Sequence, residues 1–144
     1  MIPKPITIIF FGTQEFARTI LAGFLHNDNF SVIAIVTQPD RPVGRKQILT
    51  PSPVKILTEA NNLPIFQPES LKDFIVSKEI DAVPDLHVVA QYGLMIPERI
   101  IAAPKFGTIN VHTSLLPKYR GASPIQSALM NGESETGLTI MVMD

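Results

Sequence analysis

Asn110 and His112 are the two residues of this sequence whose types and spacing best suit chemistry. They are separated only by Val111, and residues two apart on a β-strand share a face, so an amide and an imidazole would project together. The amide can donate a hydrogen bond to a developing oxyanion, and the imidazole can move a proton near neutral pH. The pair therefore suits acyl transfer, although so short a pattern is more often two polar residues where a strand enters a loop.

The segments that must position this pair alternate between two hydrophobic patterns. Short apolar runs are typical of strands buried on both faces, and apolar residues at helical spacing are typical of helices packed on a sheet. Strands are predicted over 6–12, 31–37, 64–67, 85–91, 107–112 and 137–143, and helices over 14–25, 53–61, 70–79, 97–103 and 124–131. This alternation predicts an α/β fold of the Rossmann-like type, with a mostly parallel sheet and helices on both faces.

Serine and proline residues mark the expected helix starts. Ser52 with Pro53, and Ser70, are suited to cap helices, and Pro97 suits a first helical turn. In a parallel sheet, ligands bind beyond the carboxyl ends of the strands. The loops after residues 12, 37, 91 and 112 are therefore the candidate functional region.

Composition limits the classes of protein to consider. The 144 residues are 45% hydrophobic and 17% charged, which is typical of one globular domain with an ample core. Because the net charge is −1, any nucleic-acid partner must be held by a local basic patch. The absence of cysteine excludes disulfides, thiolate zinc sites and a cysteine nucleophile. The first long apolar run, Ile6–Phe11, is too short to span a membrane, so a cytoplasmic location is predicted.

Residues 38–53 form a proline-rich segment that carries a local excess of positive charge. Four prolines and a glycine in QPDRPVGRKQILTPSP predict a long loop without helix or regular strand. Arg41, Arg45 and Lys46 lie within six positions and suit contacts with nucleic-acid phosphates, which should weaken steeply with salt. The alternative is an ordinary solvated surface loop.

The segment 107–125, GTINVHTSLLPKYRGASPI, resembles the tetrahydrofolate-dependent formyltransferases, whose signature is N-x-H followed by S-L-L-P. The resemblance implies that Asn110 and His112 are catalytic and that no metal is needed. It also implies a folate pocket lined by two stretches, although plain core packing is an equal alternative for the first of them. These stretches are Tyr92, Gly93, Leu94, Met95 and Ile96, and Ser114, Leu115, Leu116 and Pro117.

Within that family, three segments are similar to one branch, the methionyl-tRNA formyltransferases. They are LPKYRGASPI at 116–125, FGTQEFA at 11–17 and the inserted loop TQPDRPVGRKQILTPSPVK at 37–55. The resemblance implies transfer of a formyl group from 10-formyltetrahydrofolate to the α-amino group of methionyl initiator tRNA, for translation initiation. In that branch the loop approaches the tRNA acceptor end, so Arg41, Arg45 and Lys46 are the expected nucleic-acid contacts.

The sequence departs from that branch at several places. Gln14 stands where a proline is usual, Gln91 stands where an alanine is usual, and the turn before Asp85 is one residue shorter. The family's third catalytic residue, an aspartate, and the branch's C-terminal tRNA-binding β-barrel would follow Asp144. Residues 1–144 are therefore expected to be a truncated catalytic domain, a fragment of a longer protein that is inactive alone.

Two other functions stay open. A formyltransferase acting on glycinamide ribonucleotide or a sugar nucleotide would share the N-x-H and S-L-L-P pattern, but it would not need the basic loop. A folate- or RNA-binding remnant without activity would fit a chain that lacks one catalytic group.

Three further residues are given ordinary structural interpretations. Gly12 follows the first strand, but a lone glycine supports dinucleotide binding only weakly and a tight turn is favoured. His26 is expected at the surface. His87 is expected to be a buried neutral or partly exposed histidine with one hydrogen bond.

Overall fold

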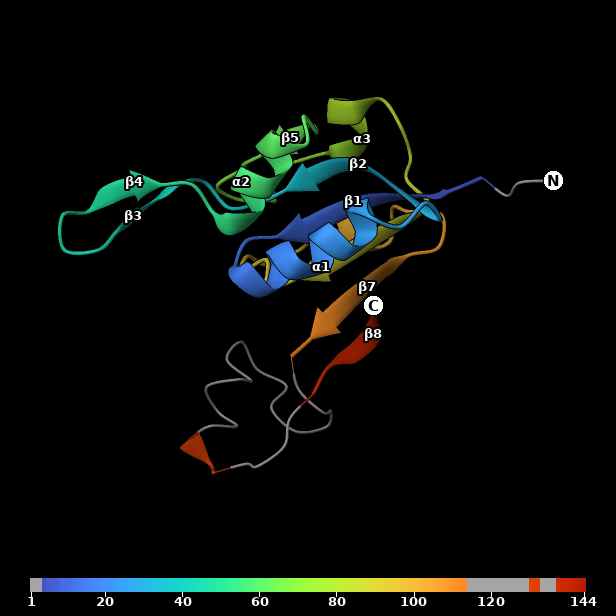
Figure 1. Ribbon diagram of the computed structural model, residues 1–144. Coiled ribbons are helices and arrows are strands. Elements are labelled where there is room, and N and C mark those ends of the chain that lie inside the picture. Colours follow the sequence, from blue (N-terminus) through green and yellow to red (C-terminus); the bar gives the residue numbers. More distant parts are fainter. Residues whose placement is uncertain (1–3, 114–129, 133–136) are drawn as a thin grey trace.

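The computed structural model describes residues 4–113, 130–132 and 137–144. Six strands form one sheet in the order β5-β2-β1-β6-β7-β8, and neighbours are parallel except for β7 and β8 (Figure 1). The predicted α/β fold with a mostly parallel sheet is confirmed. The elements in chain order are β1 (Ile6–Gly12), α1 (Glu15–Leu25), β2 (Phe30–Val36), β3 (Arg41–Val43), β4 (Ile48–Thr50), α2 (Pro53–Ala60), β5 (Ile65–Phe66), α3 (Val76–Ile80), β6 (Leu86–Ala90), α4 (Glu98–Ile101), β7 (Thr108–His112) and β8 (Thr139–Met143).

Strand β1 lies at the centre of two hydrophobic clusters. Ile8 and Phe10 belong to the cluster covered by α1 and α2, while Ile9 and Phe11 belong to the cluster covered by α3 and α4. All four side chains are fully buried, and each contributes about 1.5–3 kcal/mol through burial. A strand covered on both faces must be apolar at every position, which is why the run ITIIFFG shows no alternation.

Helix α2 begins as predicted from the sequence. Pro53 is its first residue, and Ser52 Oγ accepts a hydrogen bond of 3.1 Å from the Lys55 backbone N–H. The helix predicted over 97–103 is the single turn α4, and Pro97 precedes it as the N-cap residue. The helix predicted over 124–131 lies almost wholly outside the described residues. Among the described residues, no helix is long and apolar enough to cross a membrane.

The helix predicted over 70–79 is wrong over its first half. Helix α3 begins only at Val76, and Ser70 closes a local turn by accepting from the Lys72 backbone N–H at 3.1 Å. The Arg99 guanidinium takes its acceptors from this segment, the backbone carbonyls of Leu71, Lys72 and Phe74 at 2.5–2.6 Å. Carbonyls held by a distant arginine are drawn away from the pattern that a continuous helix needs, so this tertiary contact overrides helical spacing.

The prediction that 38–53 contains no regular strand is also wrong. Strands β3 and β4 pair antiparallel, with Arg41 opposite Thr50 and Val43 opposite Ile48. The connection uses left-handed backbone at Gly44, with φ of 75°, and at Gln47, with φ of 50°. Proline is tolerated here because each strand of a two-stranded ribbon is an edge strand. The resulting β3–β4 hairpin projects from the body of the domain, beyond the carboxyl end of β2 (Figure 1).

Candidate active site

The predicted catalytic pair lies at the carboxyl edge of the sheet. In β7, Val111 is 6% exposed and packs in the cluster under α1, so Asn110 and His112 lie on the opposite face. Asn110 is in register with Val89 of β6. The side chains of Asn110 and His112 are both only partly buried. The alternation predicted from N-x-H is therefore present, and the amide and imidazole share one face at a strand end.

The loop after β6 is fixed at the same edge by its backbone. The Tyr92 carbonyl accepts two hydrogen bonds of 2.8 Å, from Thr13 Oγ1 and from Gln38 Nε2. The Thr13 backbone N–H also donates to the Gln91 carbonyl at 3.1 Å. Because Thr13 follows β1 and Gln38 follows β2, three strand-end loops meet at this point.

Close packing explains two glycines at this edge. A side chain at Gly93 would collide with the Gln38 amide, and its φ of 92° is itself unfavourable for any other residue. A Cβ at Gly12 would lie 2.9 Å from the Ala90 carbonyl oxygen and 2.8 Å from Ala17 Cβ. Gly12 therefore permits close approach of neighbouring elements, which agrees with a structural rather than a dinucleotide-binding role.

The predicted folate-lining residues divide into different environments. Tyr92 is 2% exposed and contacts the Phe11 ring edge-on at 5.7 Å, so its ring belongs to the core. Burial raises the pKa of Tyr92 to about 12. Leu94 and Ile96 are half-buried against the same cluster, and Met95 is 90% exposed.

The structure therefore brings the loop that holds Leu94 and Ile96, and the Asn110–His112 pair, to the ends of the neighbouring strands β6 and β7. The other predicted stretch, Ser114 to Pro117, lies outside the described residues. An apolar loop beside an amide and an imidazole can hold a flat, largely apolar molecule while presenting polar groups to its reacting end. Within the described ranges, no three His, Asp or Glu side chains are grouped so that they could hold a metal ion.

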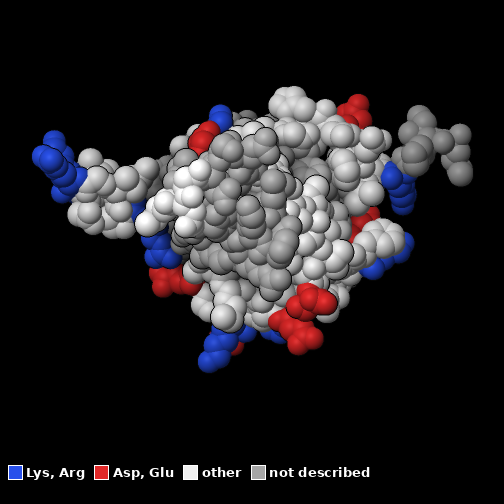
Figure 2. All heavy atoms as spheres, turned by 90° about the horizontal axis from the view of Figure 1, so that it is seen from below, with Lys and Arg blue, Asp and Glu red and all other residues white. Residues whose placement is uncertain are grey.

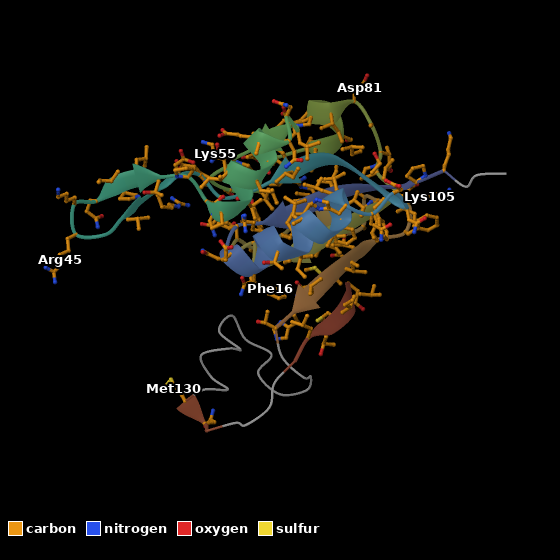
Figure 3. The ribbon with its side chains drawn as sticks, viewed as in Figure 1. Phe16, Arg45, Lys55, Asp81, Lys105 and Met130 are labelled. Carbon is orange, nitrogen blue, oxygen red and sulfur yellow. The ribbon has the colours of Figure 1, made fainter. Side chains whose placement is uncertain are left out.

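The three predicted nucleic-acid contacts lie on the β3–β4 hairpin. Arg41, Arg45 and Lys46 are all exposed, and the last two occupy the connection between the strands. Figure 3 labels Arg45 at the far end of the hairpin, and Figure 2 shows Lys and Arg atoms gathered at that tip. The hairpin also exposes the apolar side chains of Val43, Ile48 and Leu49. An exposed arm with cations at its tip can reach a phosphate backbone that does not enter the site itself.

A polar cluster holds the root of the hairpin. Lys55 Nζ lies 3.0 Å from both carboxylate oxygens of Asp40, and Gln67 Nε2 donates to Asp40 Oδ1 at 2.9 Å. The hydrogen bond from Gln67, followed by that from Lys55, lowers the pKa of Asp40 below its ordinary value. Asp40 therefore stays ionised and ties β2, α2 and the segment after β5 together where the hairpin begins.

Sequence reasoning missed the residues that assemble this edge, namely Thr13, Gln38, Asp40, Lys55 and Gln67. Their positions in the sequence could have indicated two of them, because Thr13 and Gln38 directly follow predicted strands whose carboxyl ends were expected to border the site. Their shared partner, a backbone carbonyl about fifty residues or more away, could not be found from residue type.

Comparison with known proteins extends these observations. Residues 4–144 match the family model described as "Formyl transferase". The chain is 51% identical over 140 residues to a methionyl-tRNA formyltransferase of Staphylococcus epidermidis, covering 94% of this chain and 44% of that protein. It is 51% identical over 141 residues to a methionyl-tRNA formyltransferase of Caldicellulosiruptor saccharolyticus, covering 95% and 45%.

The solved structures show the same fold at lower identity. Glycinamide ribonucleotide transformylase 1 from Geobacillus kaustophilus superposes with a TM-score of 0.69 at 24% identity, covering 97% of this chain and 75% of that one. The chain thus spans less than half the length of the curated relatives it matches.

Proposed function

The chain belongs to the formyl transferase family, and from this premise we propose that its protein transfers a formyl group from 10-formyltetrahydrofolate to the α-amino group of methionyl initiator tRNA. The observation that carries the proposal is the placement of Asn110 and His112 on one face of the carboxyl edge, beside the loop from Gly93 to Ile96. The names of the two curated relatives support the choice of acceptor. Because the chain spans less than half of those relatives, the third catalytic group and the tRNA-binding domain remain predictions.

Each member of the pair has a role in this reaction. The α-amine attacks the formyl carbon, so a C–N bond forms, the bond to the folate nitrogen breaks, and the amine loses a proton. The Asn110 amide would donate a hydrogen bond to the formyl oxygen as negative charge develops on it. His112 would stabilise the same intermediate and help to move the proton between the two nitrogens. Leu94 and Ile96 would hold the flat ring of the folate.

The β3–β4 hairpin supports a nucleic-acid acceptor over a small amine. A chain of net charge −1 has no general attraction for RNA, yet its hairpin presents Arg41, Arg45 and Lys46 to solvent. A mononucleotide held at the site would have no contact with cations at the tip of a projecting arm. The alternative, formylation of glycinamide ribonucleotide or a sugar nucleotide, therefore leaves the arm without a function.

The decisive experiment uses the full-length protein. It compares two acceptors, and it compares one variant of the candidate site with a matched control variant. Formylation of methionyl-tRNA is expected, with no formylation of glycinamide ribonucleotide. In Asn110→Ala, kcat should fall by about 100- to 1,000-fold, the usual effect of removing one oxyanion donor. The control is Gln14→Ala, which removes an exposed amide that makes no capping hydrogen bond. Normal turnover in Asn110→Ala would contradict the role of the amide, and a preference for the small acceptor would contradict the substrate.

A further inference from the structure

His87 is a buried polar side chain that has no hydrogen-bonding partner among the described residues. It is 1% exposed, and neither ring nitrogen reaches a hydrogen-bonding partner in the part of the chain that the structure describes. The one hydrogen bond expected from the sequence is therefore missing. Its ring instead lies 5.0 Å from the ring of Phe11, tilted by 60°. Buried polar groups in native proteins are nearly always paired, so an unpaired imidazole needs an explanation.

A cavity of about 270 Å³ adjoins this imidazole. Apart from His87, Arg99 and Ser77, the residues that line it have apolar side chains, from the segment before β6, from α3 and from α4. Some of them are exposed at the surface, Val83 at 68% and Ile75 at 40%, so the cavity is accessible from solvent. An apolar cavity of 150 Å³ already holds benzene, so this volume accommodates a ring with a few substituents.

The cavity is separate from the candidate active site. His87 is in register with Ile9 and Thr108, at the beginning of its strand, whereas the candidate site follows the ends of β6 and β7. Figure 3 shows Asp81 and Lys105, close in sequence to the lining residues, at the end of the domain opposite Arg45. A ligand here would therefore not compete with the substrates of the proposed reaction.

The charge state of the lining selects a neutral ligand. Burial lowers the pKa of His87 to about 4, and the nearby backbone of Ile100, which does not meet hydrogen-bonding geometry with the ring, acts in the opposite direction, so the ring is neutral at neutral pH. A neutral imidazole offers one N–H donor and one acceptor nitrogen. The charged lining residue, Arg99, already donates to three backbone carbonyls, which satisfy much of its guanidinium.

From the volume, the apolar lining and the unpartnered imidazole, we propose that this cavity binds a small neutral aromatic molecule carrying one hydroxyl or N–H group, which hydrogen-bonds His87. The class includes phenols and indoles of up to about ten non-hydrogen atoms. The proposal does not depend on the formyl-transfer reaction.

Phenol and toluene form a matched pair of probes, since they have nearly the same shape and differ in the hydroxyl. Binding to the purified protein is followed by the ¹⁵N shifts of the His87 ring and by calorimetry. Phenol should bind saturably and at least about fivefold more tightly than toluene, the factor that one net hydrogen bond supplies. In His87→Leu the preference should vanish, and both probes should then bind equally.

A second variant keeps the test independent of any folding defect in His87→Leu. Ala103→Phe places a large ring at the cavity wall from an exposed position, without changing His87. It should reduce phenol binding by tenfold or more, while Lys105→Gln, a nearby exposed position outside the lining, should leave it unchanged. The proposal is overturned if phenol fails to bind saturably, if toluene binds as tightly as phenol to the unmodified protein, or if Ala103→Phe has no effect.

Discussion

Under the proposed function, neutralising the β3–β4 hairpin should change how salt affects tRNA binding, and the number of cations on the hairpin sets the expected size of the change. The perturbation is the triple variant Arg41→Gln, Arg45→Gln, Lys46→Gln. All three side chains are exposed, and only Arg41 has a hydrogen bond within the described residues, a long one of 3.5 Å to Gln38 Oε1. The substitutions should therefore leave the fold unchanged and remove three positive charges.

The expected magnitude follows from counterion release. Each phosphate contact contributes a slope of about −0.7 to −0.9 to the dependence of log affinity on log salt concentration. If all three cations contact phosphates, the variant should lose about 2–3 from that slope. Between about 50 and 200 mM salt, the unmodified protein should therefore weaken by roughly 20- to 40-fold more than the variant.

The assay is the dissociation constant for methionyl-tRNA at four or more salt concentrations, together with KM for the folate donor. The matched control is Lys72→Gln, Lys78→Gln, Lys105→Gln, which removes the same charge from exposed positions outside the hairpin. Both triple variants change the net charge equally, so only a local contact can separate them. Equal salt slopes in the two variants would refute the assignment, and a changed folate KM would show that the hairpin acts on the site instead.

Three further predictions concern stability. Gly12→Ala should lower the free energy of unfolding in urea by about 1–3 kcal/mol, because the new methyl group meets the Ala90 carbonyl oxygen at 2.9 Å, and an unchanged midpoint would contradict the packing argument. Tyr92→Phe should raise that free energy by about 1 kcal/mol, because it removes a buried hydroxyl that is unpartnered within the described residues; a loss of stability would show that this hydroxyl has a partner. The pKa of Asp40 is lowered first by the hydrogen bond from Gln67 and then by that from Lys55. The ionised carboxylate therefore stabilises the fold fully above the ordinary pKa of 3.8, and this contribution is lost as the pH falls through the folded pKa. Across this pH range, the melting temperature should change less with pH in Asp40→Asn than in the unmodified protein.

Local sequence patterns were sufficient to predict the central strand β1 and helix α2, whose N-cap is marked by Ser52 and Pro53. The run from Ile6 to Gly12 predicted a strand buried on both faces because nothing polar interrupts it, and Ser52 with Pro53 marked a helix start that needs only its own neighbours. The pattern failed at 70–75, where the decisive contact comes from Arg99, more than twenty residues away. It also failed at Pro42, because a high density of proline argues against an interior strand but not against an edge strand.

The candidate site divides in the same way. Asn110 and His112 were predictable because alternation along a strand is local. The bonds from Thr13 and Gln38 to one carbonyl were not, because they depend on which strands lie next to each other. The unpartnered state of His87 was hidden for the same reason, since its surroundings come from α3, α4 and the segment before β6. Residue type indicated which groups could react, and tertiary structure decided what each group contacts.

The Tyr92 carbonyl accepts hydrogen bonds from both Thr13 and Gln38, so one oxygen atom links the loop after β6 to the segment where the hairpin begins. Gln38 lies at the root of the hairpin, and Tyr92 opens the loop after β6, the strand next to the one that carries Asn110. A Cβ at Gly93 would collide with the Gln38 amide, so the loop and this side chain are closely packed. A hairpin that swings when it meets a polynucleotide must either break this bond or carry the loop with it. Under the proposed function, movement of the hairpin on binding the acceptor would therefore be coupled to the position of the loop that would hold the donor.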